Sequence, residues 1–469
     1  MSSPTSETIR DRRGRIAGEA ATAFASLAIR PLVILLVLVM PLAAADFKAG
    51  TASKVITPTE PLWMSGYAGR NKPCDTKQHD LWVKAVAIED GAGNRCVILT
   101  SDLCGIPRSL SEPVCVEVMK RTGLKRENIL LSCSHTHCGP VVRDNLMDMY
   151  EMPPDQPAKI FAYTDKLRGW MIETIVAAVK DLKPAKVSVG EGTARFAVNR
   201  RQNTEKGVIN GIDPVGPVDH SVPVLKVEDD KGTLKAVVFG YACHNTTMDY
   251  FMWSGDYAGF AQIEVEKKHP GALALFWIGC GGDANPLPRR KIELCEKYGK
   301  ELAVAVAETL DGKTKPLTEK LTAKYAEVSL PLGEIPGKEK WEADVGSKNH
   351  AAKMLAKKML EQLKTGKIPE NYPHYPVQVW RFGDQLTWVS LGGEVVIDYN
   401  KRLKKEIGGK SPVWVTGYAN DVMSYIPSAR VVKEGGYEGE SSQIYYGFPT
   451  KWSPKIEDII VNKALELSK

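Results

Sequence analysis

Two histidines separated by one residue, His135 and His137, form the pattern in the sequence with the clearest chemical meaning. They follow the apolar run 129–134, whose composition is typical of a β-strand. Residues two apart in an extended segment point to the same side, so both imidazoles could face one metal ion. The alternative interpretation is a polar turn with one buried, hydrogen-bonded histidine. The spacing permits a metal site but does not require one.

Other ligand-type residues also stand just beyond strand-like apolar runs. They are His244 after 236–243, Asp283 and Asn285 after 273–278, and Glu394 after 387–391. In open α/β sheets ligands bind at the carboxyl ends of strands, where the strand ends meet and the loops are free to vary. Four such exits in one chain predict an active-site rim.

Each of these residues also has a purely structural interpretation. His244 could be a satisfied core histidine, and the first turn of a helix would stabilise the carboxylate of Glu394. Asp283 and Asn285 could form a turn, as these residue types commonly do. Tyr425 alone would be interpreted as a half-buried loop aromatic. Their joint placement favours a metal site more than any single residue does.

The elements that must position these side chains alternate between short apolar runs and longer helical patterns. Predicted strands are 83–88, 96–100, 129–134, 236–242, 273–278, 387–391 and 413–416, and predicted helices are 163–182, 257–268, 291–310, 340–363, 395–407 and 456–467. This order predicts an α/β fold, a single layered catalytic domain over 46–469. We expect a central mixed or mostly parallel sheet flanked by helices, with the metal site at strand carboxyl ends. Segment 317–332 predicts an extra edge strand, and 336–375 a polar surface excursion.

The composition excludes several classes of protein. The 469 residues are 43% apolar and 25% charged, an ordinary globular balance rather than that of a disordered chain. Of the net charge of +6, residues 1–45 contribute +2, from five arginines and three acidic residues, and the charge of the remaining chain is spread without a basic block. We therefore expect no nucleic-acid partner and at most transient contact with a membrane surface. Nine cysteines include at least one free thiol, and no disulfide pairing is predicted.

Residues 1–45 differ in kind from the rest of the chain. Five arginines precede the apolar run 31–42, and three alanines follow it. A basic region, a short apolar region and a small-residue cleavage site are typical of a secretory signal. The alternative is an uncleaved anchor, although the run is shorter than the roughly 20 residues that span a bilayer. We therefore expect export to the periplasm or the outside of the cell.

Several short segments, taken in order from about 50 to 450, resemble the catalytic domain of the neutral/alkaline ceramidases. The segment Ser-His-Thr-His-Cys-Gly-Pro at 134–140 looks like that family's Thr-His-Thr-His-Ser-Gly-Pro signature. The other matching segments are GTASKVITP at 50–58, MSGYA at 64–68, SDL at 101–103, VNR at 198–200, SGDYAG at 254–259, YIP at 425–427 and YEG at 437–439.

The resemblance implies one zinc ion per chain, held by His135, His244, Glu394 and Tyr425. Two imidazoles, a carboxylate and a phenol oxygen are suitable zinc ligands, and a catalytic zinc keeps a position for water. The resemblance further implies that His137 contacts the substrate or its oxyanion. The implied reaction is hydrolysis of the N-acyl amide bond of ceramide or a related N-acyl lipid.

The resemblance also implies catalytic roles for Arg200, Asp283 and Asn285, although Arg201 leaves the register of the arginine open. Family members carry a serine in the Gly-Asp-x-Ser-Pro-Asn loop, where this chain has Asn285. An amide cannot form an acyl-enzyme, which favours a water route. We also expect the chain to lack the C-terminal immunoglobulin-like domain of full-length ceramidases. Two alternatives therefore stay open: a zinc hydrolase with another amide or ester substrate, and a catalytically weak metal- or ligand-binding protein.

Overall fold

The largest sheet of the computed structural model, which describes residues 47–409 and 411–469, is mixed. Its strands run in the order β10 (Leu273–Ile278), β9 (Leu234–Tyr241), β8 (Ser221–Asp229), β5 (Lys183–Thr193), β1 (Phe47–Val55), β2 (Trp82–Glu89), β3 (Arg95–Ser101) and β4 (Ile129–Cys133). β12 (Lys315–Pro316) pairs with β5. The outer pairs β10–β9 and β3–β4 are parallel, and the pairs between them are antiparallel. The predicted mixed α/β sheet is confirmed.

A second sheet packs on one face of the large sheet. It consists of β13 (Leu321–Pro331), β14 (Asn371–Phe382), β15 (Leu386–Leu391) and β17 (Val413–Thr416), with β13 at an edge as predicted for 317–332. Alternate residues of β2 divide between the two faces, so that Val86 and Ile88 enter the core between the sheets while Val83 and Ala85 face the helices. The ring of Trp277 lies 5.4 Å from that of Trp388 across this interface. Large aromatic side chains therefore join the two sheets.

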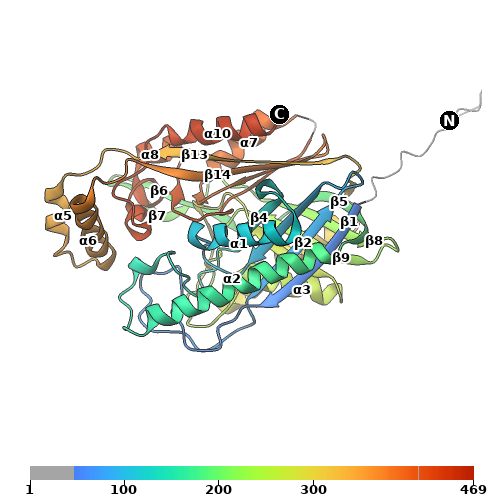
Figure 1. The fold of residues 1–469 in the computed structure, drawn as a ribbon, viewed down its shortest axis with the longest axis horizontal. Coiled ribbons are helices and arrows are strands. Elements are labelled where there is room, and N and C mark those ends of the chain that lie inside the picture. The colour runs from blue at the N-terminus through green and yellow to red at the C-terminus, as the bar shows by residue number, and fades with distance from the viewer. Residues whose placement is uncertain (1–46, 410) are drawn as a thin grey trace, which may run out of the picture. The chain divides into compact units, whose positions relative to one another are not determined.

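Helices cover the outer faces of both sheets (Figure 1). Core residues of α1 (Arg108–Thr122), α2 (Gln156–Lys180), α3 (Asp256–Lys268) and α4 (Ile292–Leu310) pack against the large sheet. Core residues of α7 (Ile397–Ile407) and α10 (Ile456–Leu467) pack against the second sheet. The result is four layers in the order helix, sheet, sheet, helix.

Two differences from the sequence predictions have local causes. The predicted helix 340–363 is two helices, α5 (Lys338–Asp344) and α6 (His350–Thr365), because Gly346 interrupts it and the Asn349 side chain caps the second. α1 was missed because its apolar residues lack a clear helical period and Pro113 lies inside it. The predicted leader 1–45 lies outside the described residues.

Two further features bear on the sequence predictions. All nine cysteines are buried and free. Among the helices of the described ranges, none combines the length and apolar composition that a bilayer crossing requires.

Candidate metal centre

Short backbone pairings bring the four predicted ligands together. His135 follows β4 and His244 follows β9, and the two exit loops are joined by a parallel bridge between Thr136 and Asn245. Glu394 opens β16 (Glu394–Val395), which pairs in parallel with β18 (Tyr425–Ile426). In that pairing Glu394 and Tyr425 are direct register partners. The ligands therefore come from two exit loops of the large sheet and from the separate two-stranded sheet of β16 and β18.

The polar atoms of these side chains converge at hydrogen-bonding distances. Glu394 Oε2 lies 3.1 Å from His135 Nε2 and 3.2 Å from His244 Nε2. Tyr425 Oη lies 3.1 Å from His244 Nε2. The two histidines and the carboxylate can offer one ligand atom each to a common centre. All four side chains are buried.

The hydrogen bonds of the imidazoles show why a cation suits this centre. His135 Nδ1 lies 2.6 Å from the carbonyl of Cys104, and His244 Nδ1 lies 2.7 Å from that of Gly281. A carbonyl can only accept, so each Nδ1 carries the proton and each neutral ring presents a lone pair at Nε2. Two lone pairs facing a buried carboxylate repel it unless a proton or a metal ion lies between them. The donor set therefore fits a zinc ion.

The pKa values of these groups reflect the same competition. Burial lowers the pKa of His135, but the charges of Glu394 and Cys104 and the hydrogen bonds with these two residues together raise it to about 10. Burial lowers the pKa of His244 to about 3, with a further decrease from the nearby Arg200. Without a metal, one proton shared between His135 and Glu394 relieves the repulsion. A divalent cation would replace that proton.

Arg200, and not Arg201, points into the centre. Its guanidinium donates to Tyr425 Oη at 3.0 Å and to Asn285 Oδ1 at 3.3 Å. Arg201 instead pairs with Glu434 and Glu438. A positive charge beside the phenol favours its ionised form, the form that binds a metal. The structure thus places Arg200 in contact with Tyr425, and Asn285 in contact with Arg200.

His137 borders the centre on another side. Its Nε2 lies 3.1 Å from His135 Nε2, and its buried Nδ1 has no hydrogen-bond partner among the described residues. Burial lowers its pKa well below the usual value, and the charges of His135 and His244 lower it further. The ring of Tyr67 packs edge-on against it at 4.7 Å. A neutral imidazole with a free nitrogen suits hydrogen bonding to a substrate.

We expect Gly66→Ala to displace His137. Gly66 has a φ of 97°, and an added Cβ would lie 2.3 Å from His137 Cγ. Shifting a catalytic group by about 1 Å costs on the order of 10²-fold in rate, so kcat should fall by about that factor while the metal content stays unchanged. Gly69→Ala is the matched control, since a Cβ there would meet nothing within 4 Å. Equal kcat values for the two variants would contradict the assignment of His137.

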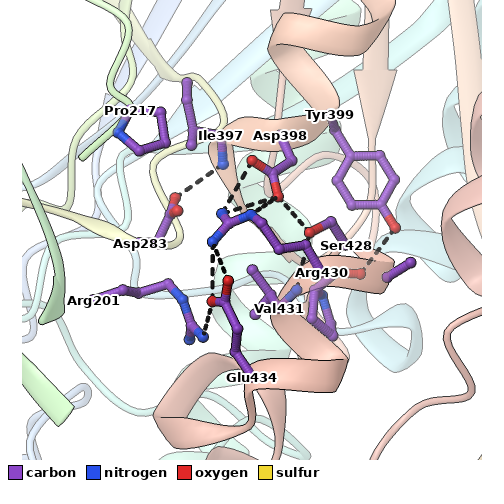
Figure 2. Close-up of polar contacts among 12 residues, drawn as sticks. Arg201, Pro217, Asp283, Ile397, Asp398, Tyr399, Ser428, Arg430, Val431 and Glu434 are labelled. Carbon is purple, nitrogen blue, oxygen red and sulfur yellow. Dashed lines mark hydrogen bonds and ion pairs between the residues drawn. The ribbon is translucent and has the colours of Figure 1, made fainter. Parts of the chain in front are cut away.

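Asp283 lies apart from the ligand atoms. Its Oδ1 accepts a hydrogen bond from the backbone nitrogen of Ile397 at 2.9 Å, at the start of α7 (Figure 2). Its Oδ2 accepts from Asn199 Nδ2 at 3.2 Å. This carboxylate caps the helix that follows Glu394. These contacts hold the start of the helix in place, and the catalytic role expected for Asp283 from the sequence remains a prediction.

Three residues near the centre were not predicted from the sequence. Tyr446 Oη donates a short hydrogen bond to Glu394 Oε1, and Tyr418 Oη lies 3.5 Å from Glu394 Oε2. Cys104 Sγ lies 3.8 Å from His135 Nδ1. Tyr418 follows the predicted strand 413–416, so strand-exit reasoning could have found it. Tyr446 lies in a 3₁₀ turn, Ser441–Tyr446, that carries no recognisable pattern.

A cleft with a volume of about 770 Å³ has Tyr446 in its wall. Much of its wall is apolar and includes Leu146, Phe161, Met359, Ile368 and Met423. Because Tyr446 also donates a hydrogen bond to Glu394, this one side chain lies between the cleft and the ligand set. The polar segment predicted as a surface excursion contributes α6 to this wall.

A buried carboxyl in the cleft wall, Asp421, should make stability depend on pH. Burial raises its pKa to about 7, although the hydrogen bonds from Tyr372 and from the backbone of Arg108 lower it. In the unfolded chain it ionises near pH 4. Between about pH 4 and pH 7 the folded protein holds this proton more tightly than the unfolded chain, so the free energy of unfolding should fall as the pH rises. Asp421 should contribute up to about 1.4 kcal/mol per pH unit to this fall. Above pH 7 its contribution should no longer change.

Asp421→Asn should remove this dependence. Denaturant unfolding of both proteins at several pH values gives the difference in their stabilities, in which other titrating groups cancel. We expect the free energy of unfolding of the variant, minus that of the wild type, to increase from pH 4 to pH 7 and to stay constant above pH 7. A difference independent of pH would show that Asp421 titrates normally.

The chain matches the family model described as neutral/alkaline non-lysosomal ceramidase, N-terminal, over residues 47–322. It belongs to this ceramidase family. The match includes His135 and His244 but ends before Glu394 and Tyr425, so the last two ligands rest on the geometry above.

Relatives of known identity agree with the ceramidase assignment. Neutral ceramidase A of Dictyostelium discoideum is 24% identical over 245 residues, or 49% of this chain and 33% of that protein. Neutral ceramidase B of the same organism is 27% identical over 229 residues, or 44% and 30%. The matched segment thus spans about a third of the length of these relatives.

Solved structures share the fold. The crystal structure of neutral ceramidase from Pseudomonas aeruginosa aligns with a TM-score of 0.70, at 18% identity, over 90% of this chain and 74% of that one. A ceramidase complexed with C2 gives a TM-score of 0.71, at 18% identity, over 90% and 75%. The layered architecture is therefore that of the ceramidase family.

Proposed function

We propose that this protein is a zinc-dependent amidohydrolase that cleaves the N-acyl amide bond of ceramide or a related N-acyl lipid. The proposal rests on one observation: the polar atoms of His135, His244, Glu394 and Tyr425 converge at 3.1–3.2 Å in a buried centre whose donor set fits a metal cation. Membership in the ceramidase family supports amide hydrolysis as the chemistry. A zinc ion held by these ligands would activate water and polarise the amide carbonyl.

The surrounding residues have distinct roles in this proposal. His137, neutral and with an unpaired ring nitrogen among the described residues, would accept the proton that the attacking water loses and pass this proton to the nitrogen of the leaving amine. Arg200 holds Tyr425 and Asn285 in place from the opposite side. Tyr446 fixes the orientation of Glu394.

The cleft supports a lipid-like substrate. Its apolar wall suits an acyl chain, and it opens at Tyr446, one hydrogen bond from the ligand set. Burying each methylene of the chain contributes about 0.8 kcal/mol to binding. Substrates with longer acyl chains should accordingly have lower KM values until the cleft is filled.

Metal analysis and turnover together test this proposal. The purified protein should contain one zinc per chain and hydrolyse a fluorescent N-acyl sphingosine, a shorter N-acyl amide, or both. Chelation should abolish turnover, and added zinc should restore it. If the protein contains zinc but hydrolyses only esters, its substrates belong to a different class. If it contains no zinc and turns over no amide or ester, the proposal is wrong.

We further propose that the protein is exported, on the composition of residues 1–45. Mass spectrometry of the protein from its native host should find an N-terminus near residue 46. An intact N-terminus on cytoplasmic protein would contradict export.

A further inference from the structure

Two consecutive arginines, Arg289 and Arg290, lie beside the candidate metal centre. The Arg290 guanidinium carbon lies 4.8 Å above the ring centroid of Tyr67. The same Tyr67 ring packs against His137 at 4.7 Å. One aromatic side chain therefore separates this cationic segment from the imidazole that faces the substrate.

The segment is held in place by hydrogen bonds to its backbone. Arg290 donates its amide hydrogen to Thr247 O at 2.7 Å, and its carbonyl accepts from Tyr250 Oη. Tyr298 Oη donates to the carbonyl of Pro288 at 2.6 Å. Arg290 has a φ of 82°, a left-handed conformation that costs energy for a residue with a side chain. Such a conformation persists where the surrounding structure enforces it.

The positive charge of this segment is poorly compensated. Arg290 has one carboxylate nearby, Asp249, at 3.4 Å and 46% exposed. Arg290 Nη1 is buried and has no hydrogen-bond partner among the described residues. Burial and the charge of Arg290 lower the pKa of the neighbouring Arg289. Arg200, by contrast, pairs at 2.7 Å with the buried Glu438, which it shares with Arg201. A half-buried guanidinium that has only an exposed carboxylate beside it in the described part of the chain favours binding of an anion from solution.

The cationic segment and the apolar cleft lie against different members of the centre. The cleft reaches Glu394 through Tyr446, and the arginines reach His137 through Tyr67. A substrate whose acyl chain occupies the cleft would place its amine part towards the arginines. The two sides of an amide substrate would then meet surfaces of different chemistry.

We propose that Arg289 and Arg290 form a subsite for an anionic group, a carboxylate or a phosphate, on the amine part of the substrate. This inference rests on the proposed N-acyl amide hydrolase function and narrows its substrate class to acidic N-acyl compounds, such as N-acyl amino acids or phosphorylated N-acyl lipids. Guanidinium groups bind both kinds of anion through paired hydrogen bonds.

Binding of uncleavable ligands tests the subsite separately from turnover. The ligands are 4-oxopentadecanoate, in which a methylene replaces the amide nitrogen of N-lauroylglycine, its phosphonate counterpart and its neutral carboxamide. Calorimetry on the full-length protein at neutral pH should find one or both anions bound at least about tenfold more tightly than the carboxamide. The tighter anion identifies the natural group.

Variants decide whether the arginines cause this preference. In Arg289→Gln the affinity for the anionic ligand should become nearly equal to that for the carboxamide, so that the anion-to-carboxamide ratio of affinities is close to one. In Arg289→Lys part of the preference for the anion should remain. Arg168→Gln, which removes an exposed arginine of α2, is the matched control and should keep the full ratio. Thermal unfolding of each variant checks that it is folded.

Equal binding of anion and carboxamide to the wild type, or a ratio unchanged in Arg289→Gln, would overturn the subsite. Absence of amide turnover alongside a preserved ratio would instead count against the hydrolase function and leave the subsite standing.

Discussion

Replacing His135 with alanine should remove both zinc and activity. The side chain supplies one of two imidazoles in the centre, and its Nδ1 is already fixed by the carbonyl of Cys104. Without it, His244 and Glu394 remain at 3.2 Å with no second nitrogen to complete the ligand set. A lost oxyanion donor costs about 10²–10³-fold in kcat, and loss of the metal should cost at least as much. Metal analysis and kcat/KM on an N-acyl amide measure the two effects.

His374→Ala is the matched control for this variant. His374 is 51% exposed and pairs with Glu327 on the surface, so its loss should change neither metal content nor kcat/KM. A His135→Ala protein that keeps full turnover in the presence of a chelator would refute the metal centre.

Replacing Glu438 with alanine should cause the largest loss of stability. Glu438 is almost completely buried and accepts from Arg200 Nε at 2.7 Å and from Arg201 Nη1 at 2.6 Å. Its removal leaves two buried guanidinium groups with reduced or no compensation. Breaking a buried ion pair in this way costs about 3–5 kcal/mol. Denaturant unfolding should show a decrease of this size in the free energy of unfolding.

The same variant should also impair the centre, because Glu438 fixes the guanidinium that contacts Tyr425 and Asn285. Glu361→Ala removes an exposed ion pair with Lys364 and should cost less than about 1 kcal/mol. If both glutamate variants were equally stable, the buried pair would contribute nothing beyond a surface one.

Much of the fold follows from local pattern. The strands 129–134, 236–242 and 273–278 are confirmed nearly to the residue as β4, β9 and β10, because buried strands read as continuous apolar runs. The predicted mixed α/β sheet and the ceramidase family are likewise confirmed. Strands with half-exposed faces, such as β5 and β7 (Gly207–Asp213), were missed because their apolar residues are sparse. The roles of the site residues remain predictions.

The sequence alone determined which side chains could bind a metal ion or take part in catalysis, and which of them lie close together along the chain. The His135–His137 pair, His244 and Glu394 could be identified from the sequence as candidate metal ligands because a strand ends just before each of them. Nothing local indicates that Glu394 and Tyr425 become register partners, or that Tyr446 contacts Glu394. The packing of two sheets on a shared aromatic core decided these contacts, because only that packing brings strand ends from separate sheets to one point.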